Sequence, residues 1–170
     1  MPATVSRVVD RVRRAAMLAY RHAPMPVRRL VIRLIAPTFT VGAVVVVRRS
    51  DGALLMVEQR HTGAWALPGG LLQRGEDAAT AAAREVAEEV GIEIDPRDLR
   101  TPRTVLDPRR RSIDLVFFHE LDHPGRAHRN DPIEVTRVAW FSPAELPSLT
   151  EPTVGIVGSL DLCDMHPFGS

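Results

Sequence analysis

The strongest constraint on this 170-residue chain lies in residues 68–92, where a glycine-rich turn leads into one well-marked helix. The turn is Pro-Gly-Gly at 68–70, and a second turn follows at Gly75. Asp77 can cap a helix because its side chain accepts hydrogen bonds from the free amides of the first turn. Five of the six residues from 78 to 83 are alanine, the strongest helix former, and Gly91 can close the helix in the left-handed conformation. These signals predict a helix over residues 77–90.

One face of this predicted helix carries three carboxylates. Glu85, Glu88 and Glu89 stand at i, i+3 and i+4, and each like-charged pair at such spacing costs an isolated helix about 0.2–0.5 kcal/mol. Arg84 lies four residues before Glu88 and offsets part of this repulsion. Clustered carboxylates provide the oxygen ligands that Mg²⁺ prefers. The three glutamates alone also fit a charged, solvent-facing helix, so the wider spacing decides between the two interpretations.

The wider spacing resembles the Nudix box, the motif of the Nudix hydrolase family. Gly70 is followed after five residues by Glu76 and, after seven more, by REVAEEVGI at 84–92; the preceding WALPGG at 65–70 is also similar to the family's pattern. The resemblance implies an α/β fold, a Nudix-type α/β/α sandwich with a mixed sheet. It also implies a nucleotide pyrophosphatase, which uses Mg²⁺ or Mn²⁺ and water to cleave the pyrophosphate bond of a nucleoside diphosphate linked to another group.

The same resemblance implies roles for individual residues. The metal ligands would be the carboxylates of Glu85, Glu88 and Glu89 and the backbone carbonyl of Gly69. Arg84 would orient these carboxylates rather than contact substrate. In the family, the general base is a box glutamate or an acid in a later loop. Among the later acids we favour Glu134 as base or further metal ligand, with Asp131 and Glu120 as alternatives.

Substrate contacts are predicted from side-chain chemistry. Arginine pairs well with phosphate, so Arg60, Arg103 and Arg109 are candidate phosphate contacts, although each also fits a solvated turn or surface position. Trp65 is a candidate base contact or a core residue. Pro108 stands sixteen residues past the box, a placement that resembles ADP-ribose pyrophosphatases, whereas oxidised nucleoside triphosphates are an equally open class. The alternative function is a Nudix-fold module that binds nucleotides without cleaving them, and the intact glutamates argue against it.

The start of the chain differs from the rest in charge. Residues 1–36 carry eight arginines and one acid, about +7, whereas the remainder carries 14 arginines and 20 acids, about −6. Apolar residues recur at helical spacing on both sides of Pro24, so we expect a basic amphipathic helical extension (1–37) before a Nudix hydrolase domain (38–170). The extension would pack on the core or in a homodimer, or contact an anionic membrane surface. No stable nucleic-acid complex is expected, because Tyr20 is the only aromatic residue of the segment.

Composition and periodicity complete these expectations. No run of 18 apolar residues exists to span a bilayer, and a single cysteine, Cys163, excludes an internal disulfide and favours a reducing, cytoplasmic location. Apolar and β-branched runs predict strands at 40–47, 54–57, 104–106, 113–120 and 133–141. Helices are expected after Ser142, where the sequence resembles a capping box, and over residues 153–163. The expected partner is a small, nucleotide-type substrate.

Overall fold

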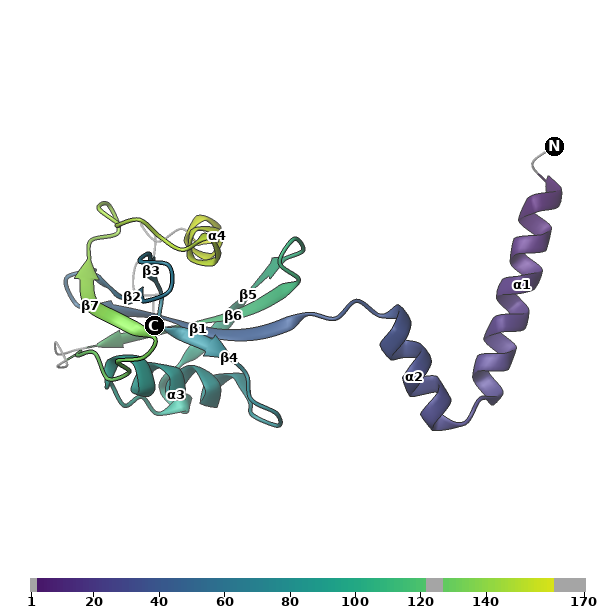
Figure 1. Ribbon diagram of the computed structural model, residues 1–170, viewed down its shortest axis with the longest axis horizontal. Helices are drawn as coiled ribbons and strands as arrows, with labels where there is room; N and C mark the ends of the chain where they lie inside the picture. Colours follow the sequence, from purple (N-terminus) through teal and green to yellow (C-terminus); the bar gives the residue numbers. More distant parts are fainter. Residues whose placement is uncertain (1–2, 122–126, 161–170) are drawn as a thin grey trace, which may run out of the picture. The chain divides into compact units, whose positions relative to one another are not determined.

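The computed structural model describes residues 3–121 and 127–160. The chain divides into two compact units, with the boundary in the sequence between Thr38 and Phe39. The first unit holds the helices α1 (Ala3–His22) and α2 (Met25–Ile35) (Figure 1). The Arg28 guanidinium lies over the Tyr20 ring, 4.9 Å from its centroid, across the break between the helices. The prediction that helices precede the sheet domain is confirmed. None of the described helices has the length and apolar character needed to cross a membrane.

The second unit is built on one mixed sheet, with seven strands in the described part of the chain. They are β1 (Thr40–Arg49), β2 (Leu54–Gln59), β3 (Trp65–Ala66), β4 (Gly69–Leu71), β5 (Arg100–Asp107), β6 (Ser112–Leu121) and β7 (Val135–Phe141). The order across the sheet is β3-β2-β1-β6-β5, and β4 and β7 pair with β1 and β2. β1 and β6 run parallel, whereas the other pairs are antiparallel.

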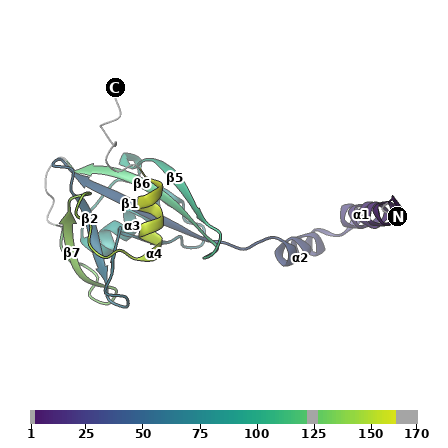
Figure 2. The ribbon, with the colours of Figure 1, turned by 90° about the horizontal axis from the view of Figure 1, so that it is seen from above.

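A helix covers each face of this sheet (Figures 1 and 2). The two are α3 (Ala78–Val90) and α4 (Glu151–Ser159), and a short 3-10 turn, η1 (Pro96–Asp98), follows α3. Successive side chains of a strand point to opposite faces, so Val45 of β1 packs in the core with Ala82 and Val86 of α3. Its neighbour Val46 packs in the second core with Ile156 of α4. The predicted α/β/α sandwich with a mixed sheet is confirmed.

Local signals set the limits of α3 as expected. The Asp77 carboxylate accepts hydrogen bonds from the amides of Ala79 and Thr80, both at 3.1 Å. Gly91 ends the helix at a φ of 69°, a conformation that glycine adopts without a side-chain penalty. The catalytic candidates on α3 therefore stand on a helix that is capped at both ends.

The helix predicted after Ser142 is wrong. The Glu145 amide donates to the Ser142 carbonyl at 2.9 Å, and the chain makes a single turn there. Pro147 explains the difference, because the residue before a proline is disfavoured in the helical region and proline lacks an amide hydrogen. The closing helix begins at Glu151 rather than residue 153, and its predicted end at 161–163, with Cys163, lies outside the described residues.

Candidate active site

The glycine turn brings the backbone of β4 against α3. A β-carbon on Gly69 would lie 2.4 Å from the Ala43 carbonyl oxygen, and one on Gly70 would lie 2.5 Å from the Glu85 carboxyl carbon. Residues without a side chain are therefore required for this approach. The Gly69 amide also donates a hydrogen bond to Glu89 Oε2 at 3.0 Å. The turn and two of the three glutamates are packed as one unit.

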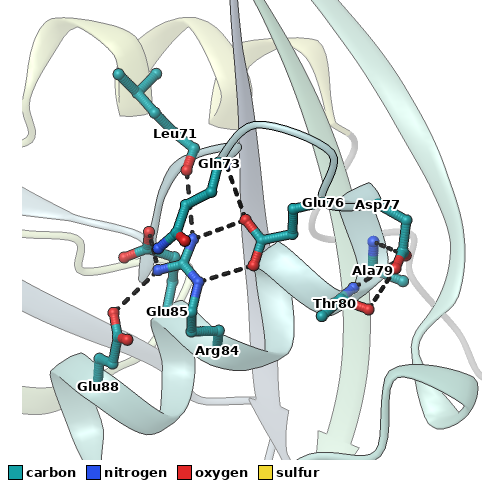
Figure 3. A network of polar contacts seen from close by, with 9 residues as sticks. All are labelled: Leu71, Gln73, Glu76, Asp77, Ala79, Thr80, Arg84, Glu85 and Glu88. Carbon is teal, nitrogen blue, oxygen red and sulfur yellow. Dashed lines mark hydrogen bonds and ion pairs between the residues drawn. The ribbon is translucent and has the colours of Figure 1, made fainter.

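Arg84 contacts three carboxylates at once (Figure 3). Its Nη1 donates to Glu85 at 2.8 Å and to Glu88 at 3.0 Å. Its Nε and Nη2 donate to the two oxygens of Glu76, at 2.8 and 3.1 Å. Glu76 also accepts a hydrogen bond from the Gln73 amide at 2.9 Å, so it braces the loop before the helix. The contact of Arg84 with Glu88 was expected from the i+4 spacing, whereas the contact with Glu76 closes the loop onto α3.

Burial changes the acidity of two of the glutamates. Glu89 is only 6% exposed, and burial raises its pKa to about 8; the Gly69 hydrogen bond opposes this rise, and the nearby charges of Glu85 and Glu134 add to it. Burial also raises the pKa of Glu85, against the effect of Arg84. Burying a carboxylate disfavours its charged form unless a cation compensates it. A cation bound beside Glu85 and Glu89 would therefore offset the cost of ionising both carboxyls.

The turn before β7 carries Glu134 and is held from two sides. The Asp131 carboxylate accepts from the amides of Ile133 at 2.7 Å and Glu134 at 3.3 Å. The Arg60 guanidinium donates to the carbonyls of Pro132 at 2.9 Å and Ile133 at 3.1 Å, and the Arg60 amide donates to the Glu134 carbonyl at 2.8 Å. In this structure Arg60 thus holds the Glu134 turn in place. The phosphate contact predicted for Arg60 stays a prediction.

Glu134 lies close to the helix carboxylates. It lines a cavity of about 300 Å³ together with Glu89 and Arg60, and its charge contributes to the raised pKa of both Glu85 and Glu89. Of the alternative bases, Asp131 also raises the pKa of Glu89 through its negative charge. Glu120 instead pairs with Arg100 at 3.2 Å. The structure therefore groups Glu134 with the box glutamates, although 45 residues separate Glu134 from Glu89 in the sequence.

A larger cavity of about 810 Å³ adjoins the glycine turn. Its lining includes the turn itself, β1 and the start of α4, with the charged residues Arg110, Asp114 and Glu151. Arg110 and Glu151 form an ion pair at 2.9 Å. Asp114 was not predicted from the sequence; burial raises its pKa, and a β-carbon on Gly42 would lie 2.4 Å from its Oδ1. The available signal was one acid inside the apolar run 113–118.

The remaining predicted substrate contacts lie elsewhere. Trp65 is 8% exposed in the core, with its ring 4.7 Å from that of Phe141 and in an edge-on arrangement. Arg103 is exposed on β5. Arg109 lines a separate cavity of about 310 Å³ that shares Asp114 with the larger one. The structure does not bring these three residues to the carboxylates, and their contact with substrate stays a prediction.

The residues around α3 fit a divalent cation in their chemistry. The available ligand atoms are carboxylate and carbonyl oxygens, which suit Mg²⁺ and Mn²⁺. Because Gly70 has no side chain, the Glu85 carboxylate can occupy the space beside it. As the side chains lie, Arg84 holds Glu85 and Glu88, and no three acidic, histidine or cysteine residues converge as metal ligands within residues 3–121 and 127–160. Each of these two glutamates gives Arg84 one carboxylate oxygen, so metal binding requires their other oxygens to turn toward a common point.

The fold and the glycine turn before a carboxylate-bearing helix define a class of α/β enzymes that hydrolyse phosphoanhydride bonds. The sequence model of the NUDIX domain matches residues 38–156, and this chain belongs to the Nudix family. The prediction of a hydrolase acting on the phosphoanhydride bonds of nucleotides is confirmed by this membership.

Three similar proteins illustrate the range of the family. A MutT-like protein from Streptomyces ambofaciens is 34% identical over 65% of this chain and 68% of its own length. A Bacillus subtilis (strain 168) protein named as an 8-oxo-dGTP diphosphatase is 31% identical over 67% of this chain and 74% of its own. The third is a bifunctional NMN adenylyltransferase/ADP ribose pyrophosphatase from Francisella tularensis, whose crystal structure contains AMP and manganese. It matches with a TM-score of 0.63 and 25% identity over 78% of this chain and 44% of its own.

Proposed function

We propose that this protein hydrolyses the pyrophosphate bond of a nucleoside diphosphate linked to another group, with Mg²⁺ or Mn²⁺ as its metal. The observation that carries the proposal is the grouping of Glu134 with Glu85 and Glu89 beside the Gly69–Gly70 turn. In this proposal residues 38–170 form the hydrolase domain, and residues 1–37 are a separate extension. Family membership supports the reaction class, and the arrangement of carboxylates supports the assignment of residues.

The metal would be held by the carboxylates of Glu85, Glu88 and Glu89 and by the Gly69 carbonyl. A bound divalent cation neutralises phosphate charge and lowers the pKa of water. Arg84 acts as a positioning residue, because its contacts with Glu85 and Glu88 set the direction of both carboxylates and its contact with Glu76 fixes the helix to the preceding loop. Substrate contact is not needed for this role.

Glu134 is the proposed general base. Its side chain is exposed and faces the cavity that it shares with Glu89, so water reaches it. Its backbone is held by Asp131 and Arg60, which limits the positions that its carboxylate can take. Glu89 is a poorer candidate, because it is buried and its carboxylate already accepts the Gly69 hydrogen bond. Glu134 would accept the proton of the attacking water while the phosphoanhydride bond breaks.

The nucleotide would occupy the 810 Å³ cavity beside the glycine turn. This volume lies within the range of roughly 300–1,000 Å³ typical of small-molecule sites. The cavity reaches Gly70, which touches the Glu85 carboxylate, so a substrate placed here has its phosphates next to the proposed metal ligands. Arg110, which is paired with Glu151, offers a cation in the lining, and Asp114 offers an acceptor for hydroxyl or amino groups.

Two substrate classes are supported by the similar proteins. The Francisella protein is named as an ADP ribose pyrophosphatase, which favours a nucleotide sugar, and Pro108 lines the smaller cavity next to Arg109. The Bacillus protein is named for 8-oxo-dGTP, which favours an oxidised triphosphate. The two classes differ in their products, so one assay separates them.

The test is a product assay on the full chain with ADP-ribose, dGTP and 8-oxo-dGTP, each with Mg²⁺, with Mn²⁺ and with EDTA. Release of AMP and ribose 5-phosphate would assign the nucleotide-sugar class, whereas release of a nucleoside monophosphate and pyrophosphate would assign the triphosphate class. Glu134→Gln should lower turnover by roughly 100-fold or more. The matched control is Glu93→Gln, which changes an exposed acid outside the cavities described above. A folded protein that cleaves none of these substrates with either metal would contradict the proposal.

A further inference from the structure

The two N-terminal helices expose large apolar side chains. In α2 these are Met25, Val27, Leu30, Ile32, Leu34 and Ile35, which are 47–76% exposed. In α1 they are Val9, Met17 and Leu18, which are 57–67% exposed. Nine of the thirteen exposed large apolar side chains among the described residues thus belong to these helices. Such a concentration of apolar surface marks an interaction site rather than ordinary surface variation.

The same helices carry a strong positive charge. Residues 1–36 hold eight arginines and one acid, whereas the rest of the chain holds 14 arginines and 20 acids. α2 contains Arg28, Arg29 and Arg33 and no acid. Of the arginines between residues 11 and 33, none takes part in an ion pair with an acid that the structure describes. The partner of this segment should therefore supply negative charge.

Part of the apolar surface of each helix lies apart from most of its arginines. At about 100° per residue, Val27, Leu30 and Leu34 fall along one side of α2. Arg29 and Arg33 fall on the other side. In α1, Ala16 and Ala19 share a side with Val9, and the arginines at 11, 14 and 21 lie away from it, whereas Arg13 lies beside Val9. Helices of this kind bind in the plane of a membrane interface.

We propose that α1 and α2 bind the surface of a membrane that contains anionic phospholipids. The apolar side chains would enter the boundary between headgroups and acyl chains, and the arginines would contact the lipid phosphates. An anionic bilayer covers the apolar side chains and neutralises the arginines in one binding event. A second copy of the chain would also cover apolar side chains, but pairing these helices would bring two clusters of eight arginines together. Charge complementarity therefore favours the membrane.

Membrane binding by α1 and α2 does not depend on which nucleotide the second unit hydrolyses. Outside the extension the chain carries a formal charge of about −6, so an anionic surface repels it and only the extension supplies attraction. Binding would hold a nucleotide hydrolase at the membrane without a spanning helix. The hydrolysis measured in solution, without vesicles, should not depend on it.

Vesicle flotation of the full chain tests the proposal. The vesicles contain phosphatidylcholine and phosphatidylglycerol in equal amounts, or phosphatidylcholine alone, at low and at high NaCl. We expect the protein to float with the anionic vesicles. Its partition coefficient should fall by about tenfold or more when phosphatidylglycerol is left out or salt is raised, because both changes weaken the attraction of the arginines.

Two double variants separate the apolar and the electrostatic contributions. Leu30→Gln with Leu34→Gln removes apolar insertion, and Arg29→Gln with Arg33→Gln removes charge. Each should reduce partition to anionic vesicles by about tenfold or more. The melting temperature and the hydrolysis rate in solution should remain those of the parent chain, which shows that each variant is folded.

Control changes of the same kind lie in the second unit. Val154→Gln alters an apolar side chain that is 54% exposed, and Arg97→Gln alters an arginine that is 89% exposed. Both should leave partition unchanged. Failure of the parent chain to float with anionic vesicles would overturn the proposal, as would flotation that ignores both phosphatidylglycerol and salt. Light scattering could instead show that the parent chain is a dimer and that the Leu30→Gln/Leu34→Gln variant is a monomer. If that dimer also failed to float, the helices would be assigned to contact with a second copy.

Discussion

The Gly69 amide donates a 3.0 Å hydrogen bond to the carboxylate of Glu89, which lies twenty residues later in the chain. The bond joins the glycine turn of β4 to the last turn of α3. Glu89 is only 6% exposed, so this amide is an important stabilising partner for its carboxylate. Because Gly69 and Glu89 are both proposed metal ligands, a displacement of either residue changes the position of the other.

Replacing the helix carboxylates with amides should separate catalysis from stability. Glu88→Gln and Glu89→Gln should each lower turnover by roughly 100-fold or more, because an amide binds a hard cation more weakly than a carboxylate does. Melting temperatures should stay the same or rise, since Glu88→Gln removes a negative charge from a crowded face and Glu89→Gln removes a buried carboxyl that takes up a proton on folding. Steady-state kinetics and thermal melts of the metal-free proteins measure both quantities. Turnover close to that of the parent chain in both variants would refute the metal assignment.

The raised pKa of Glu89 predicts a pH dependence of stability. In the folded, metal-free chain this pKa is about 8, against an ordinary value of 4.5, so between these values the folded state holds a proton that the unfolded state has lost. The free energy of unfolding should therefore fall as pH rises from 5 to 8, with a slope of up to about 1.4 kcal/mol per pH unit. Below about pH 4.5 the stabilising contribution of protonated Glu89 to the free energy of unfolding is fully present.

Urea unfolding in EDTA across this pH range measures the slope, and Glu89→Gln is the control. The variant should show a flatter profile, with a remainder from Glu85 and Asp114, whose pKa values burial also raises. Asp51 and Asp95 have pKa values lowered to about 2 by arginine partners, so they titrate below the range. A parent and variant with parallel profiles would show that Glu89 titrates normally.

The local parts of the site could be predicted from the sequence. α3 begins and ends where Asp77 and Gly91 indicate, because a cap and a left-handed glycine act within a few residues of the chain. Its carboxylates share one face because helical spacing alone determines that relation. The main strands were expected for similar reasons, since alternation and β-branched runs are local patterns.

The parts of the site that are distant in the sequence depend on strand pairing. Local sequence patterns do not reveal which strands pair or in which register. Glu134 approaches Glu89 because β7 pairs with β2, where Gln59 lies opposite Val135. Asp114 faces the cavity because β6 runs parallel to β1 in a register that sets it opposite Gly42. A shift of one residue in that register would turn Asp114 to the other face of the sheet.

A side chain at Gly70 should disturb the site more than the fold. In Gly70→Ala the new β-carbon would lie 2.5 Å from the Glu85 carboxyl carbon, and the carboxylate, as the end of a flexible side chain, would move away. We expect turnover to fall by about 10–100-fold, as for a displaced metal ligand, with a small change in melting temperature. Gly158→Ala is the control, because nothing lies within 4 Å of its added carbon. Equal turnover in the two variants would argue against a role for the Glu85 position.

Arg60 can be tested as a positioning residue against its predicted role as a phosphate contact. Arg60→Gln removes the hydrogen bonds to the carbonyls of Pro132 and Ile133 and loosens the Glu134 turn. Positioning of Glu134 predicts a fall in kcat of about 10-fold or more with little change in KM. A phosphate contact predicts a raised KM instead. Arg97→Gln, at an exposed arginine outside the cavities described above, should alter neither constant.

Asp114 should determine how tightly the substrate binds rather than how fast it reacts. Its carboxylate lies in the 810 Å³ cavity beside Gly42 and is not a hydrogen-bond partner of Arg84, and it can accept hydrogen bonds from hydroxyl or amino groups of a nucleotide. Asp114→Asn keeps the shape and replaces one acceptor with a donor. Loss of one such bond is worth on the order of 1.4 kcal/mol, so KM should rise about tenfold while kcat stays within about twofold.

The Asp114→Asn variant should also be as stable as the parent chain at pH 7 or more so, because burial disfavours the charged carboxylate that it removes. Asp98→Asn, at an exposed acid after α3, is the matched control and should leave KM and kcat unchanged. Unchanged KM in Asp114→Asn for a substrate that the parent chain cleaves would place the nucleotide outside this cavity. A fall in kcat without a change in KM would instead connect Asp114 to the reacting phosphates.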